Sequence, residues 1–201
     1  MRLHRLLLEQ FRNYPRLALE DGSHDLHLFI GPNGSGKTNL LEAISVLSLT
    51  QSCRDADEAD LPQWGAGFFR VTGVAGTDDG EERRMEVVGE MAPRRRKACF
   101  VNDVRLPVTE MVGQLPSVAF LPEDLSLFAG PPTERRRFLD RLLCQVSPEY
   151  VRSLSEYNRI LKQRNALLRA IADGHSTRGD LPPWDRELAK AGSRVTVGRL
   201  E

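Results

Sequence analysis

The sequence predicts an α/β fold with a helical second lobe, and three observations support this prediction. A short apolar run at residues 26–30 ends at a glycine-rich loop. Apolar residues at helical spacing follow that loop directly, which indicates a strand–loop–helix unit. From Thr133 onward the pattern becomes helical up to the last residue. A chain of 201 residues is long enough for one core and a small lobe.

The loop at residues 31–38 fits the pattern G-x-x-x-x-G-K-[ST] at every position. Its backbone N–H groups, together with the N-terminus of the following helix, form a nest for phosphate. We expect Lys37 to reach the β- and γ-phosphates and the Thr38 hydroxyl to hold Mg²⁺. A plain glycine-rich turn is the alternative, but Lys and Thr in register favour a nucleoside triphosphate site. The predicted binding residues are Gly31, Pro32, Asn33, Gly34, Ser35, Gly36, Lys37 and Thr38.

Two predicted strands, at residues 3–10 and 16–20, come before the strand that leads into the loop. An aromatic and basic turn at residues 11–15 joins them. Small-molecule kinases of the P-loop class usually begin with the loop strand itself. This order therefore favours an ATPase head in which an antiparallel layer holds the nucleotide base.

After the helix predicted beyond residue 38, strands are expected at residues 68–74, 83–88 and 98–101, with a turn at residues 102–103. This series of hairpins includes a cluster of four consecutive cations, which are Arg94, Arg95, Arg96 and Lys97. A solvated loop is one interpretation of such a cluster, and contact with DNA phosphates is the other.

Residues 118–121 form another apolar run, which predicts a buried strand. Because Glu123 and Asp124 follow it, a Walker B strand with a carboxylate near Mg²⁺ is one interpretation. Walker B acids normally follow the strand directly, whereas Pro122 intervenes here. A loop near the nucleotide is the interpretation that the sequence favours.

The second lobe is predicted to be a set of amphipathic helices. Thr133 is a candidate N-cap, and Ser147 followed by Pro148 indicates the start of the next helix. That second helix carries an apolar heptad stripe interrupted by Arg164, which predicts packing in a helical hairpin. Its basic residues Arg159, Lys162 and Arg164 either form a solvated face or contact DNA.

A loop at residues 173–183 and a last helix from Trp184 complete this lobe. We therefore expect a head with the P-loop and the hairpin layer at residues 1–132. The helical lobe is expected at residues 133–201.

The composition of the chain limits the classes of protein to which it can belong. The chain is 40% hydrophobic and has a formal net charge of zero, so any case for nucleic acid depends on local patches. Its three cysteines are scattered, which argues against a disulfide framework or a zinc site. No apolar run is long enough for a signal peptide or a membrane span, so a cytoplasmic location is expected.

Three motifs of nucleotide hydrolases are missing from the sequence. It has no apolar strand running straight into Asp-Glu after residue 38, no L-S-x-G-Q signature and no N-K-x-D guanine motif. The missing N-K-x-D counts against a GTPase. The other two absences lead us to expect the N-terminal piece of a longer protein.

A series of blocks along the chain resembles the RecF family of bacterial DNA replication and repair proteins. This family is part of the ABC-type ATPases that include the SMC heads. The blocks are residues 11–14, 31–44, 122–125, 130–140, 163–168 and 184–192. The P-loop alone defines only a superfamily, whereas six blocks in order are much more specific.

The resemblance implies a P-loop NTPase fold of the ABC/SMC-head type with its C-terminal part missing. It implies a protein that binds ATP, Mg²⁺ and DNA, and that acts at single-strand/double-strand junctions or gaps. Such a protein helps to load the recombinase in recombinational repair and the SOS response, with mediator proteins of the RecR and RecO type. By the same resemblance, Arg12 and Asn13 are expected near the nucleotide.

The resemblance also implies a homodimer that forms with ATP, and slow DNA-dependent hydrolysis, in the full-length protein. The signature motif and the Walker B acids of the family lie in a C-terminal segment that this chain does not contain. Two alternatives stay open. One is a metabolic P-loop kinase whose helical lobe closes over a phosphorylated substrate. The other is a module that binds ATP or DNA without hydrolysis.

Overall fold

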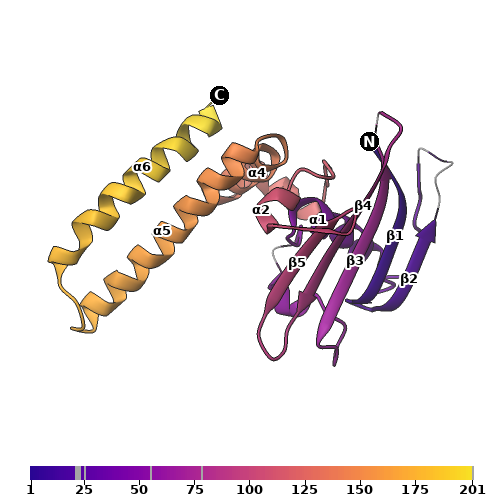
Figure 1. Cartoon of the computed structure of the whole chain (residues 1–201), viewed down its shortest axis with the longest axis horizontal. Coiled ribbons are helices and arrows are strands. Elements are labelled where there is room, and N and C mark those ends of the chain that lie inside the picture. The colour runs from indigo at the N-terminus through magenta and orange to yellow at the C-terminus, as the bar shows by residue number, and fades with distance from the viewer. Residues whose placement is uncertain (21–23, 25, 55, 78, 201) are drawn as a thin grey trace. The chain divides into compact units, whose positions relative to one another are not determined.

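The computed structural model describes residues 1–20, 24, 26–54, 56–77 and 79–200. The chain divides into two compact units, Met1–Asp124 and Leu125–Glu201, and each is described by itself. Figure 1 labels the elements of both units.

Unit 1 is built on a six-stranded sheet in the order β2-β1-β3-β4-β5-β6. Every neighbouring pair of strands is antiparallel. The predicted hairpin layer is therefore confirmed, including the turn at Asn102 and Asp103, whose φ angles of 48° and 64° suit a tight hairpin. The strands are Arg2–Phe11 (β1), Tyr14–Glu20 (β2), Phe68–Gly76 (β3), Glu82–Glu90 (β4), Arg96–Val101 (β5) and Val104–Leu106 (β6).

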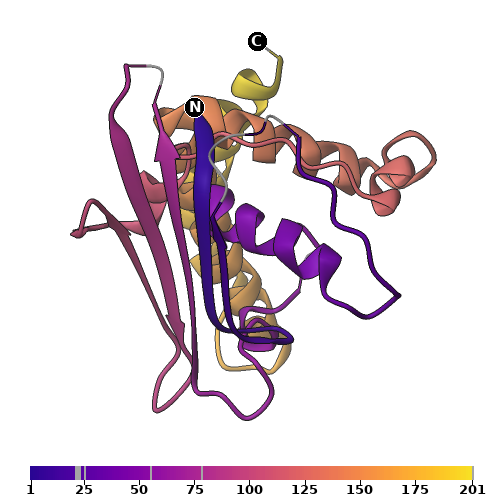
Figure 2. The same ribbon diagram turned by 90° about the vertical axis from the view of Figure 1, so that its right-hand side faces the viewer.

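One face of this sheet carries the core of unit 1. Alternate residues of the strands are buried, as expected when only one face of an antiparallel sheet is covered. The helices α1 (Lys37–Leu49) and α2 (Val108–Met111) contact β-strands of the sheet, and α1 lies across it (Figure 2). The largest buried side chains include Phe11 and Phe69, whose rings meet edge to face with their centroids 5.8 Å apart. The core also contains Leu8, Leu40, Ala43, Val46, Leu47, Val71, Met85, Val87 and Met111.

The two predicted strands at residues 26–30 and 118–121 are wrong for this structure. Both segments lack strand structure in the described residues, and the six strands of the sheet lie elsewhere. Most of their apolar side chains are exposed, with Ile30 86% and Val118 83% accessible, whereas Leu121 is buried. An apolar run predicts a strand only if another backbone pairs with it, and periodicity does not show whether one does.

Unit 2 is helical. Its helices are α3 (Ser126–Ala129), α4 (Pro132–Val146), α5 (Pro148–Ala172) and α6 (Leu181–Leu200). The short 3₁₀ turn η3 (Arg178–Asp180) also lies in unit 2. Two further 3₁₀ turns are η1 (Glu58–Asp60), which lies in unit 1, and η2 (Pro122–Leu125), which lies at the boundary of the two units in the sequence.

The predicted start of α5 is confirmed, whereas two other helix starts are wrong. Ser147 accepts a hydrogen bond from the Tyr150 N–H at 3.1 Å, which is the predicted cap. Thr133 is not the N-cap of α4, because the helix begins at Pro132 with Pro131 as its cap. Proline suits the first helical position, since its missing N–H has no helical partner there. The helix predicted from Trp184 begins earlier, at Leu181, directly after a capping box at η3.

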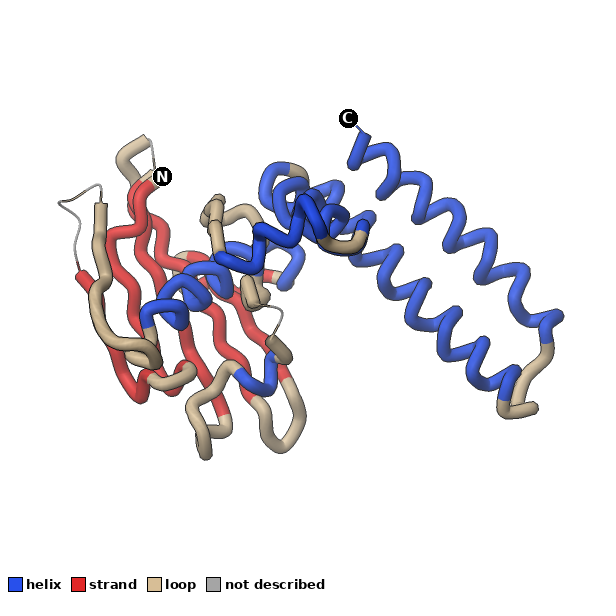
Figure 3. Tube along the Cα trace, turned by 180° about the vertical axis from the view of Figure 1, so that it is seen from behind, coloured by secondary structure: helices blue, strands red, loops and turns tan. Residues whose placement is uncertain are grey.

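The predicted hairpin packing is confirmed, because α5 and α6 run side by side in opposite directions (Figures 1 and 3). Ile160 of α5 and Val195 of α6 are buried. Arg164, which interrupts the heptad stripe, donates from Nε to Asp185 Oδ1 of α6 at 2.6 Å. The interruption in the apolar pattern is thus an ion pair between the two helices.

Asp140 joins three helices of unit 2. The Arg199 guanidinium of α6 donates to both of its carboxylate oxygens at 2.8 Å, and the Tyr150 hydroxyl of α5 donates to Oδ1. Burial and this hydrogen bond to Asp140 raise the pKa of Tyr150. Burial, with the nearby Asp140 charge, raises the pKa of the Cys144 thiol to about 11. The thiol of Cys144 is therefore protonated, and unreactive, at neutral pH.

The three cysteines are free thiols, as their spacing predicts. Among the described residues, none of the helices combines the length and the apolar character needed to cross a membrane.

Candidate nucleotide-binding site

The predicted phosphate loop leads directly into the N-terminus of α1. Gly36 is the N-cap of α1 and adopts a left-handed conformation with φ 103°. Among the described residues no side chain caps this helix end, and no acid occupies its first turn. The first N–H groups of α1 are thus available to an anion, which the helix dipole also favours.

Lys37 folds back over the loop. Its ammonium group donates to the carbonyl oxygens of Gly31 and Pro32 at 2.8 and 2.9 Å, and lies 3.5 Å from Ser35 Oγ. The cation therefore lies at the loop where a phosphate is expected. Thr38 follows it in the first turn of α1, and its side chain is exposed.

The turn between β1 and β2 packs against this loop. Asn13 donates from Nδ2 to the Ser35 carbonyl at 3.3 Å, and its Oδ1 accepts from Asn39 Nδ2 at 2.8 Å. A Cβ atom at Gly36 would lie 2.5 Å from the Tyr14 hydroxyl and 2.7 Å from Asn13 Nδ2. A side chain at this position would strain the backbone and would displace the Tyr14 and Asn13 side chains.

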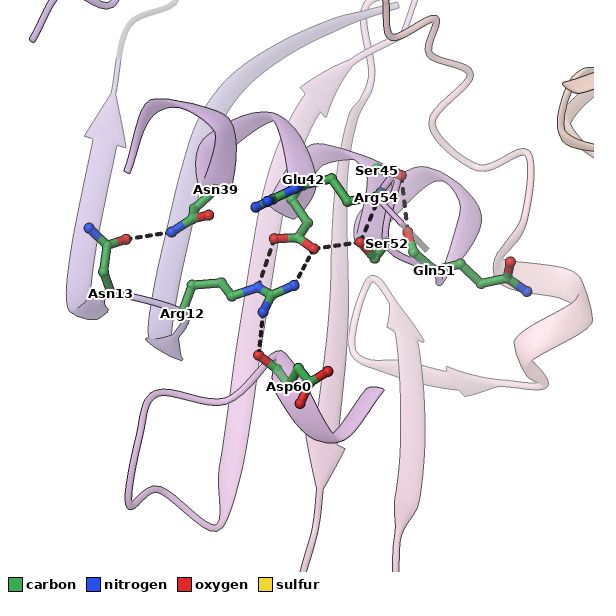
Figure 4. A network of polar contacts seen from close by, with 9 residues as sticks. All are labelled: Arg12, Asn13, Asn39, Glu42, Ser45, Gln51, Ser52, Arg54 and Asp60. Carbon is green, nitrogen blue, oxygen red and sulfur yellow. Dashed lines mark hydrogen bonds and ion pairs between the residues drawn. The ribbon is translucent and has the colours of Figure 1, made fainter. Parts of the chain in front are cut away.

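Arg12 does not point at the loop but holds the turn to α1 (Figure 4). Its Nε and a terminal nitrogen donate to the two carboxylate oxygens of Glu42 at 2.8 and 2.6 Å. Its other terminal nitrogen donates to the Asp60 carbonyl at 2.7 Å. Glu42 is fully buried and also accepts from Ser52 Oγ. The resemblance places Arg12 near the nucleotide, and the structure places its guanidinium in a buried ion pair beneath the turn.

Sequence reasoning missed Glu42 and Ser52. The one available signal is an acid within the apolar stretch of α1, where a buried charge requires a partner. The sequence could not identify that partner, because Arg12 is far away in the chain.

One interpretation of the sequence makes an acid after residue 121 a metal ligand. Asp124 accepts a hydrogen bond from the Leu121 N–H at 2.7 Å, which stabilises the start of the turn η2. The side chain of Glu123 lies outside the described residues.

The basic cluster at residues 94–97 is divided by ion pairs. Arg95 lies 3.1 Å from Asp57, and Lys97 lies 2.6 Å from Glu58 while donating to the Thr50 carbonyl. Arg94 is exposed on the turn, and Arg96 is exposed at the start of β5. Within unit 2, Arg164 is paired with Asp185, whereas Arg159 and Lys162 are exposed on α5. Each cluster thus offers only part of its charge to a phosphate backbone.

Two antiparallel strands precede the phosphate loop, and the turn between them packs against it. This arrangement is that of a P-loop ATPase head of the ABC/SMC type. A family model described as "AAA domain, putative AbiEii toxin, Type IV TA system" matches residues 26–86. An SMC ATPase structure covering 71% of the chain has a TM-score of 0.57 at 20% identity, which supports the fold alone.

The chain is similar over its whole length to proteins of the RecF family. It is 41% identical to the DNA replication and repair protein RecF of Heliobacterium modesticaldum, covering 100% of this chain and 53% of that protein. With RecF of Moorella thermoacetica the identity is 39%, covering 98% of this chain and 52% of that protein. A structure of the recombination mediator protein RecF with ATP has a TM-score of 0.88 at 31% identity, covering 98% of this chain and 52% of that one. The chain therefore spans about half the length of the relatives it matches.

Proposed function

We propose that this protein is an ATP-binding DNA replication and repair protein of the RecF type. It binds DNA at single-strand/double-strand junctions or gaps and helps to load the recombinase in recombinational repair and the SOS response. Its mediator partners are of the RecR and RecO type, and it works as an ATP-dependent homodimer in the cytoplasm. The single observation that carries this proposal is an intact phosphate loop within a chain related to RecF over its whole length.

ATP is the proposed ligand, held by residues 31–38. The uncapped N-terminus of α1 and the Lys37 ammonium supply donors and positive charge for the phosphates. Mg²⁺ fits the exposed Thr38 hydroxyl, with phosphate oxygens and water as its remaining ligands. When bound, Mg²⁺ neutralises phosphate charge. We assign no hydrolytic carboxylate in this chain, and slow DNA-dependent hydrolysis is proposed for the full-length protein.

DNA is the proposed macromolecular ligand, and the cations of α5 allow a test. Replacing Arg159 and Lys162 together by alanine should lower the slope of log affinity against log salt by about two, since each lost phosphate contact removes roughly one. Arg164→Ala is the matched control, because Arg164 is already paired with Asp185 and its loss should leave the slope unchanged. The measurement is fluorescence anisotropy of a gapped duplex at several salt concentrations.

An unchanged slope in the Arg159/Lys162 variant would return α5 to the solvated-face interpretation. The metabolic kinase alternative predicts a different result. In that case the chain would phosphorylate a small acceptor without DNA, and its affinity for the gapped duplex would be negligible at every salt concentration.

A further inference from the structure

Trp64 is fully exposed. Its relative accessibility is 101%, the highest of the exposed large hydrophobic side chains among the described residues. It lies in the loop between η1 and β3, and neither the core nor the phosphate loop uses it. Tryptophan is among the residues most often found as the anchor of a binding surface, because its large ring gains much from a partner. An indole held in solvent therefore needs an explanation.

The loop that carries Trp64 is firmly held. Gln63 N–H donates to the Gln10 carbonyl at 2.7 Å, and Ala66 N–H donates to the Gln63 carbonyl at 2.9 Å, which closes a turn around Trp64. Gly65 supplies the positive φ of 82° that this turn requires. The indole is thus displayed on an ordered backbone, so little conformational entropy is lost when a ligand packs on it.

The loop that carries Trp64 is joined to the turn between β4 and β5, where the basic cluster begins. Phe68 at the start of β3 pairs with Glu90 at the end of β4, so the Trp64 loop and the basic turn leave the sheet at the same end. The Met91 N–H donates to the Gly67 carbonyl at 2.8 Å and ties the two loops together. In Figures 1 and 2 both loops lie at this end of the sheet.

The charge left on the basic turn comes from Arg94 and Arg96. Both are exposed, although Arg96 lies opposite Glu90 in the strand pair. Their neighbours Arg95 and Lys97 are compensated by Asp57 and Glu58. An aromatic face beside exposed arginines is the combination with which proteins bind single-stranded nucleic acid, since bases stack on the ring and phosphates on the cations.

We propose that Trp64 stacks on a base of single-stranded nucleic acid whose phosphates contact Arg94 and Arg96. This surface deepens the DNA-binding part of the proposed function and rests on it. A protein partner fits less well, because the immediate neighbours Gln63 and Gly65 add no apolar area around the indole. A base, in contrast, needs only one flat ring and a nearby cation.

The chain has two tryptophans, so the variant Trp184→Phe leaves Trp64 as the single indole. Titrating this variant with oligothymidylate should quench its tryptophan fluorescence. In the parent, Trp64→Ala should weaken oligothymidylate binding on the order of tenfold or more by anisotropy. Trp184→Phe is the matched control and should keep the parent affinity. Circular dichroism should be the same for all three proteins, because the Trp64 side chain is fully exposed and Trp184→Phe keeps an aromatic ring at a half-buried position.

The outcomes separate this inference from the proposed function. If oligothymidylate binds but Trp64→Ala keeps the parent affinity, the stacking site is refuted while DNA binding stands. The stacking site is also refuted if oligothymidylate quenches the fluorescence of Trp184→Phe while Trp64→Ala keeps the parent affinity. If neither oligothymidylate nor a gapped duplex binds at any salt concentration, the DNA-binding part of the proposed function fails as well.

Discussion

Arg12→Ala is expected to lower the free energy of unfolding of unit 1 by about 3–5 kcal/mol. Among the described residues, the change leaves the fully buried Glu42 carboxylate with Ser52 as its one side-chain partner, and an uncompensated buried charge is costly. Urea denaturation followed by circular dichroism measures this loss. ATP affinity should fall with it, because Arg12 anchors the turn from which Asn13 reaches the phosphate loop.

Two further variants test whether the buried charge is the cause. Arg5→Ala removes an ion pair of similar length, 3.1 Å to Glu20, but both side chains there are about half exposed. That variant should lose less than about 1 kcal/mol. The double variant Arg12→Met with Glu42→Leu should recover most of the stability, since it leaves no buried charge. An Arg12→Ala protein no less stable than Arg5→Ala would contradict this account.

Gly36→Ala is expected to distort the phosphate loop and to weaken ATP binding by about 5- to 150-fold, which corresponds to about 1–3 kcal/mol of strain. Its Cβ would collide with Tyr14 and Asn13, and alanine disfavours a φ of 103°. Isothermal titration with Mg²⁺-ATP measures the change in affinity.

Gly34→Ala is the matched control for the collision. Gly34 has a φ of 80°, but a Cβ there would meet nothing within 4 Å. This variant carries the backbone strain alone, so its affinity should lie between those of the parent and Gly36→Ala. Equal losses in the two variants would mean that contact with the β1–β2 turn does not shape the loop.

Local patterns predicted the hairpins and the helix α5 well. Alternation of side chains and turn residues fixes an antiparallel pair between neighbours in the chain, and Ser147 with Pro148 marks a helix start by local chemistry alone. The phosphate loop is also a local pattern, contained in residues 31–38, and its binding of phosphate stays a prediction.

Features that depend on distant partners were not predicted. The run at residues 26–30 is as apolar as a strand, yet strand formation depends on a neighbouring backbone that the pattern does not specify. Arg12 and Glu42 are each ordinary charged residues in the sequence, and only the packing of α1 on the sheet makes them a buried pair. Likewise, the cluster of residues 94–97 appears uniformly basic until the fold brings Asp57 and Glu58 against it.

We propose that residues 31–38 bind the phosphates of ATP. A titration of a fluorescent ATP analogue with Mg²⁺ into the parent chain and into Lys37→Ala tests this directly. We expect saturable binding to the parent and its loss in Lys37→Ala, with unchanged unfolding curves because, among the described residues, the Lys37 ammonium hydrogen-bonds to its own loop. Lys162→Ala, a change on exposed α5, should bind like the parent. Binding by Lys37→Ala that equals the parent, or no binding by the parent, would contradict the claim.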